Sequence, residues 1–130
     1  MTHPSVSKNY SLDWYIENQV LEITFRGHFS SYDATCVNDY IAKWIANHKG
    51  NLVLLINTLE LATVVDFQDI RTRLAFVDSR RIRGIFVFTQ SKLIRLSMLV
   101  IFSLSPATIK FFDSQQEAQQ FVDSKLHLLL

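Results

Sequence analysis

Leu52-Val53-Leu54-Leu55-Ile56 is the stretch that decides the fold of this 130-residue chain. Five apolar residues in a row lack the alternation of a half-exposed strand. They are typical of a strand covered on both faces, as in the centre of a parallel sheet. Ile85-Phe86-Val87-Phe88 repeats the pattern further along the chain. Two such strands, separated by sequence with helical spacing, predict an α/β fold whose sheet is partly parallel.

The sequence before the central stretch has a different pattern. Residues 10–26 alternate between apolar and polar side chains, with a turn near Asn18-Gln19. Period two with one polar face predicts an antiparallel hairpin, and we expect Gly27 to end its second strand. After the central stretch, residues 57–65 are expected to form a loop.

Four helices are predicted between and after these strands. Ser30 and Ser114 are each followed three residues later by an acidic residue, the pattern of a capping box. Asp66 is expected to cap a helix that turns Phe67 and Val77 inward. Pro106 is expected to stop the helix that starts at Ser91.

The resulting order of elements is β-β-α-β-α-β-α-β-α. It predicts a single α/β domain over residues 1–130. We expect a mixed sheet of about five strands, an N-terminal antiparallel hairpin followed by parallel strands, with four helices.

The composition excludes several classes of protein. Thirteen Lys and Arg against twelve Asp and Glu leave a formal net charge of +1, so we expect no nucleic-acid partner. Met1-Thr2-His3-Pro4-Ser5 lacks the apolar core of a signal peptide, and no run approaches the roughly 20 apolar residues of a membrane span. The single cysteine, Cys36, excludes an internal disulfide and suits a reducing compartment, so we expect a cytoplasmic protein.

No pattern in the sequence predicts a metal or catalytic centre, and we expect neither a metal nor another cofactor. The four histidines lack zinc-binding spacing. His28, Ser30 and Asp33 are the residue types of a catalytic triad, but they fall where a helix begins, so capping is the favoured interpretation. Five of the seven arginines lie between residues 71 and 83 among acidic residues, and we interpret them as a solvated surface.

Residues 91–105 carry more apolar side chains than one face of a helix can bury. The segment has no charge after Arg95, and the narrow polar side of its helical wheel contains Lys92, Arg95, Leu99 and Ser103. Three explanations are open: a central core helix, a homodimer interface, or the wall of a pocket for an apolar ligand. A helix about 22 Å long is too short to cross a bilayer.

Three stretches, together with the order of elements, resemble the STAS superfamily and within it the SpoIIAA-like branch. They are residues 20–27 (VLEITFRG), 52–57 (LVLLIN) and 109–118 (IKFFDSQQEA). The resemblance spans about residues 10 to 125. It implies a small mixed sheet with helices packed on it, no catalysis, and a role in protein–protein regulation or small-ligand sensing.

The resemblance also implies a place for regulation. In bacterial antagonists of this type, a serine in an Asp-Ser-Ser-Gly-like motif after the central strand is phosphorylated to switch partner binding. Here Asp66 takes the acidic position but Phe67 takes the place of the serine. We therefore expect no phosphoserine switch of that kind. Thr58 and Thr63 are hydroxyls in the preceding segment, which we interpret as turn residues.

Together these features predict a non-enzymatic regulatory or protein-interaction module that forms a homodimer, or binds a protein partner, through residues 91–105. The alternative is a carrier or sensor of a small apolar ligand held between that helix and the sheet. A third hypothesis, an enzyme, rests only on polar residues at the carboxyl ends of strands. The candidate partner- or ligand-binding residues are Asn57, Thr58, Thr63, Asp66, Leu99, Phe102 and Ser103.

Overall fold

The computed structural model describes residues 9–64 and 66–130, and in that part of the chain five strands form one sheet. The strands are β1 (Tyr10–Ile16), β2 (Val20–Phe29), β3 (Leu52–Val64), β4 (Ile82–Phe88) and β5 (Thr108–Phe112). They lie side by side in chain order. β1 is antiparallel to β2, and all other neighbours are parallel. The predicted mixed sheet with an N-terminal hairpin is therefore confirmed.

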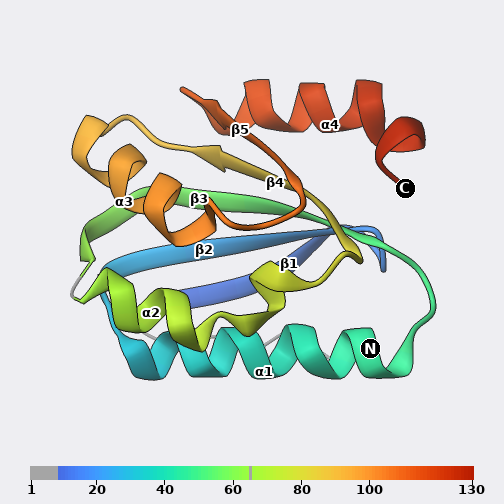
Figure 1. Cartoon of the computed structure of the whole chain (residues 1–130). Coiled ribbons are helices and arrows are strands. Elements are labelled where there is room, and N and C mark those ends of the chain that lie inside the picture. The colour runs from blue at the N-terminus through green and yellow to red at the C-terminus, as the bar shows by residue number, and fades with distance from the viewer. Residues whose placement is uncertain (1–8, 65) are drawn as a thin grey trace.

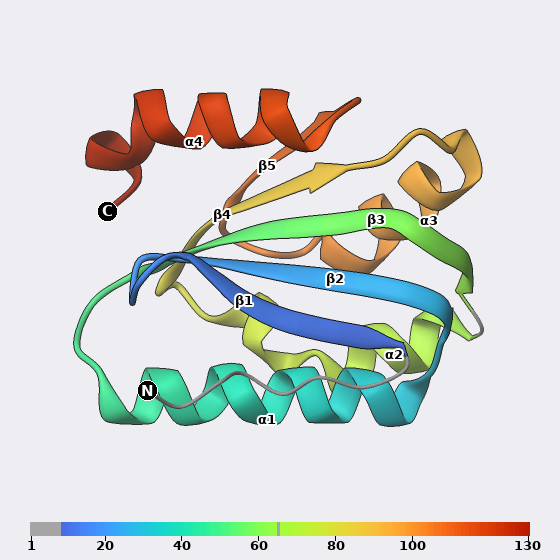
Figure 2. The same ribbon diagram turned by 180° about the vertical axis from the view of Figure 1, so that it is seen from behind.

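Four α-helices complete the described part of the chain. They are α1 (Ser31–Asn47), α2 (Phe67–Arg73), α3 (Lys92–Phe102) and α4 (Gln115–Leu129), and the 3-10 turn η1 (Ala75–Asp78) follows α2. The parallel strands succeed one another in the same direction across the sheet. Right-handed crossovers then place the connecting helices on one face. Figures 1 and 2 show this arrangement: α1, α2 and α3 cover one face, and α4 covers the other.

The central strand β3 contributes to two separate cores. Leu52, Leu54 and Ile56 lie in the larger core, under α1, α2 and α3, whereas Val53 and Leu55 lie in the smaller core, under α4. All five side chains are fully buried. A polar residue on either side of this strand would enter a core without water, which explains the unbroken apolar run.

β2 and β3 extend further than predicted. β2 continues past Gly27 to Phe29, and β3 continues to Val64 through the expected loop at 57–65, because the two strands pair with each other over this length. Gly27 lies inside β2 at a φ of 52°, a left-handed conformation that glycine adopts without strain. Register shifts in this region mark bulges, which break the alternation by which strands are identified in sequence.

The helix after Asp66 is shorter than predicted. α2 ends at Arg73, and η1 rather than the helix carries Val77 into the core. Phe67 is partly exposed instead of buried, because it occupies the first position of α2 at one end of the helix layer (Figure 1). None of the helices in the described residues is long and apolar enough to cross a membrane.

Arg81 ties the end of α1 to the start of β4. Its guanidinium donates to the main-chain carbonyl oxygens of Ile45, His48 and Gly50, and lies 5.8 Å from the ring centroid of Trp44. The last carbonyls of a helix lack partners within the helix, so Arg81 replaces the missing donors. The interpretation of the arginines as a solvated surface is therefore wrong for Arg81.

Arg81→Ala should loosen this connection. Because the carbonyls lose charge-assisted hydrogen bonds, we expect the free energy of unfolding to fall by about 1.5 to 3 kcal/mol, measured by urea denaturation. Arg83→Ala is the matched control, since Arg83 is exposed near the start of β4, two residues after Arg81, and its removal should cost less than about 0.5 kcal/mol. Equal losses in the two variants would contradict the role of Arg81.

Tyr15 links β1 to α4. Its hydroxyl donates to the Asp123 carboxylate, with oxygen–oxygen distances of 2.9 and 3.0 Å. Burial, and then the hydrogen bond and the negative charge of Asp123, raise the pKa of Tyr15 above 10.0. The fold therefore favours the protonated phenol over the phenolate.

The raised pKa of Tyr15 predicts a change of stability in alkali. A group whose pKa is higher in the folded state contributes fully below its unfolded pKa, and the contribution disappears as the pH rises through the folded pKa. We expect the wild type to lose stability above about pH 10, and Tyr15→Phe to lack that part of the loss. Thermal unfolding over an alkaline pH series measures it, and identical profiles for the two proteins would argue against the link.

Candidate functional site

α3 is buried on one side and exposes large apolar side chains on the other. Its buried side chains, Met98, Ile101 and Phe102, belong to the larger core. The exposed set, which we name the α3 face, consists of Leu93, Leu96, Leu99, Val100 and Leu104. Leu93 is 75% exposed and Leu104, just beyond the helix, is 68% exposed. The surplus of apolar residues seen in the sequence therefore lies at the surface as well as in the core.

The ends of α3 differ in charge. Ser91 caps the helix, and its hydroxyl oxygen accepts from the Ile94 N–H. Lys92 and Arg95 lie in the first turn and just after it, and α3 contains no acidic residue. The Arg95 guanidinium also lies 4.8 Å from the ring centroid of Phe111. Cations at the N-terminus of a helix meet the positive end of its dipole, so they gain nothing from their own helix.

The space between α3 and the sheet is filled by side chains. Met98, Ile101 and Phe102 are almost completely inaccessible there. In the described residues, three open cavities lie instead at the ends of the helix. One, of about 240 Å³, lies beside Leu104 and is also lined by Leu74 and Asp78, and the other two, of about 220 and 190 Å³, adjoin the capped end. None of the three has the position of a ligand site enclosed between helix and sheet.

The polar candidates within β3 already make hydrogen bonds inside the domain. The Asn57 side-chain oxygen accepts from the Leu59 N–H at 3.0 Å, and the buried Thr58 hydroxyl donates to the Phe88 carbonyl at 3.0 Å. The Thr63 hydroxyl lies 2.7 Å from Nδ1 of His28 on the neighbouring strand. The contacts of Thr58 and Thr63 tie β3 to its two neighbouring strands, and Thr58 also lines the cavity of about 220 Å³ beside the capped end of α3.

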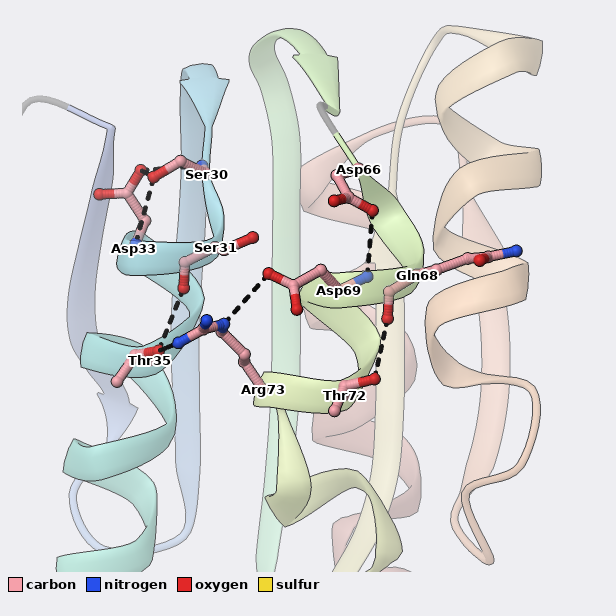
Figure 3. Close-up of polar contacts among 9 residues, drawn as sticks. All are labelled: Ser30, Ser31, Asp33, Thr35, Asp66, Gln68, Asp69, Thr72 and Arg73. Atoms are coloured by element: carbon pink, nitrogen blue, oxygen red, sulfur yellow. Dashed lines mark hydrogen bonds and ion pairs between the residues drawn. The ribbon is translucent and has the colours of Figure 1, made fainter.

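Asp66 and the starts of α1 and α2 form a polar cluster (Figure 3). Asp66 caps α2 by accepting from the Asp69 N–H, and it has a φ of 54°, in the left-handed region. Ser30 and Asp33 form the predicted capping box of α1, which confirms the capping interpretation over a catalytic triad.

Arg73 joins the two helices in this cluster. Its Nε lies 3.1 Å from the Asp69 carboxylate, and one of its terminal nitrogens donates to the Thr35 hydroxyl at 3.3 Å. A hydrogen bond from Ser31, and then the bond and charge of Arg73, lower the pKa of Asp69. The cluster is therefore a network that fixes α1 against α2. In the described residues, no three His, Cys, Asp or Glu side chains gather where they could hold a metal ion.

The structure does not bring the predicted site residues into one place. Asn57, Thr58, Thr63 and Asp66 stabilise strands and a helix start, whereas Leu99 and Ser103 are exposed on or beside α3. Phe102 is a correction: it is 0% exposed and offers no surface to a partner, because it points from the helix into the larger core.

Leu93, Leu96, Val100 and Leu104 were not singled out in the sequence. A helical wheel places the first three on one stripe, but it does not show which stripe faces water. The spacing of these residues in the sequence shows an apolar stripe. Whether that stripe is buried or exposed depends on which elements pack against the helix, and the sequence does not show this.

Comparisons with known proteins agree on the type of fold. A family model described as SpoIIAA-like matches residues 20–123. One similar solved structure is an uncharacterized protein of the DUF3478 family with a SpoIIAA-like fold from Shewanella loihica PV-4. It is 17% identical, has a TM-score of 0.66, and the match covers 90% of this chain and 98% of that chain. At this identity the likeness shows the fold alone. The comparison with curated proteins gives no match.

The two sides of α3 should respond differently to truncation. Phe102→Ala removes a fully buried ring, so we expect the free energy of unfolding to fall by about 3 to 5 kcal/mol. Leu93→Ala should change it by less than about 0.5 kcal/mol when measured at low protein concentration. Chemical denaturation of both variants measures the difference. A large loss for Leu93→Ala would mean that this residue lies in the core.

Proposed function

Because the chain belongs to the SpoIIAA-like family, we propose that it is a non-enzymatic regulatory module of the STAS type that acts by contacting proteins. The fold supports the type of module. The local hydrogen bonds of Asn57, Thr58 and Asp66 support a structural use of these polar residues. The observation that carries the proposal is the α3 face.

The α3 face supplies the energy for a protein contact. Fully burying a large aliphatic side chain contributes about 1.5 to 3 kcal/mol, and four such side chains lie on α3 with Leu104 just beyond its end. Part of this gain is offset by the entropy lost on association. A contiguous apolar surface of this kind, bordered by polar residues, is typical of an interaction site.

We infer that the partner is a second copy of this chain. Leu93, Leu96 and Val100 follow one another at intervals of three and four residues, the spacing of the seam between two packed helices. Two identical faces of this kind can bury each other around a two-fold axis, which is the commonest symmetry of protein dimers. The filled space beneath α3 gives no support to the alternative of an enclosed apolar ligand.

Leu96→Lys should abolish self-association. The substitution places a charge in the middle of the α3 face, where burial against a second copy would remove it from water. Sedimentation velocity over a range of concentrations should show a reversible dimer for the wild type and a monomer for the variant.

Leu128→Lys provides the matched control, because Leu128 is also a largely exposed leucine, at 68%, but lies on α4. This variant should dimerise like the wild type. A wild type that remains monomeric at high concentration would refute self-association. A dimer unaffected by Leu96→Lys would place the interface away from the α3 face. A dimer that dissociates only when another protein is added would show that the second copy and that protein compete for the same surface.

A further inference from the structure

We propose that the two copies of α3 pack antiparallel, with Leu96 of one copy against Val100 of the other. Leu93 of each copy then lies at the level of Ser103 and Leu104 of the other. This inference rests on the self-association proposed above and adds the orientation of the helices and the residues that meet.

The charges on α3 favour this orientation. Lys92 and Arg95 lie towards its N-terminal end, and its last turn has no basic residue. In a parallel pair the cations of the two copies would lie at the same level and repel each other. In an antiparallel pair Lys92 lies beside the C-terminal end of the other helix, where the dipole is negative. Lys92 of each copy then supplies a cation that the last turn of the other helix lacks.

The shapes of the two ends also match in this orientation. Leu93 projects from the first turn and is 75% exposed, whereas an open cavity of about 240 Å³ adjoins Leu104 at the other end of α3. The apolar residues Leu74, Ala75 and Val77 line that cavity together with the polar residues Arg71, Thr72 and Asp78. Antiparallel packing directs the projecting leucine of each copy towards the recess of the other. Parallel packing would place Leu93 against Leu93 and leave both recesses empty.

Ser103 allows the helices to come close. It continues the stripe formed by Leu93, Leu96 and Val100, and its hydroxyl donates to the Val100 carbonyl of its own helix at 3.2 Å. The small side chain therefore needs no partner from the second copy and leaves space for Leu93. A pair of helices this short buries less than the roughly 1,600 Å² of a standard interface, so the dimer should form reversibly.

Disulfide cross-linking tests the orientation. Cys36 is the only cysteine in the sequence, so Cys36→Ala gives a background in which Leu93→Cys and Leu104→Cys each carry one thiol. A disulfide needs Cα atoms within about 7 Å. We expect the mixture of the two variants, one of them mass-tagged, to form the mixed disulfide about tenfold faster than either variant cross-links with itself. Ser103→Cys replaces Leu104→Cys if the latter unfolds, as judged by circular dichroism.

The outcomes separate the orientation from the self-association itself. Rapid cross-linking of Leu93→Cys with itself would show a parallel pair, and this would overturn the inference while self-association stands. Sedimentation of the Cys36→Ala protein is run beside the cross-linking. A dimer without any of these disulfides would place the interface away from α3 and overturn the inference. A monomer would refute self-association and the orientation together.

Discussion

The burial of β3 on both faces is the constraint on which the rest of the structure depends. An apolar strand in the middle of a parallel sheet needs a helix layer on each side, since neither face can meet water without a cost. Here the strands succeed one another in chain order, so the three crossover helices lie on the same face and only α4 is left to cover the other (Figures 1 and 2). The smaller core under α4 and the larger core under α1, α2 and α3 follow from this one topology.

The same topology explains why α3 has an open side. It is the last of the three helices along the layer, so it has α2 beside it in one direction and no helix of the described chain in the other (Figure 1). The buried side chains of α3, which are Met98, Ile101 and Phe102, pack in the core beneath it. The side chains of the α3 face therefore remain exposed in a single copy of the domain, and the proposed second copy would bury them.

The sequence allowed those parts of the fold to be predicted that depend on local patterns. The run at Leu52–Ile56 indicated a central strand, and Ser30 and Ser114, each followed by an acidic residue three positions later, marked where two helices begin. Features that depend on distant partners were missed. The bulged extension around Gly27 exists because β2 and β3 pair there, and Arg81 meets carbonyls that are remote in sequence. The helical wheel of α3 showed too many apolar residues, but only the position of α3 at the end of the layer decides which of them face water.

Hydrogen–deuterium exchange as a function of protein concentration tests the central claim most directly, because it locates the contact without any substitution. If the α3 face is buried against a second copy, amide exchange in peptides covering Lys92–Leu104 should slow as the concentration rises through the dissociation constant. Exchange in α1 and α4 should stay unchanged. Exchange in Lys92–Leu104 that is the same at all concentrations, in a protein shown to be dimeric, would contradict the claim.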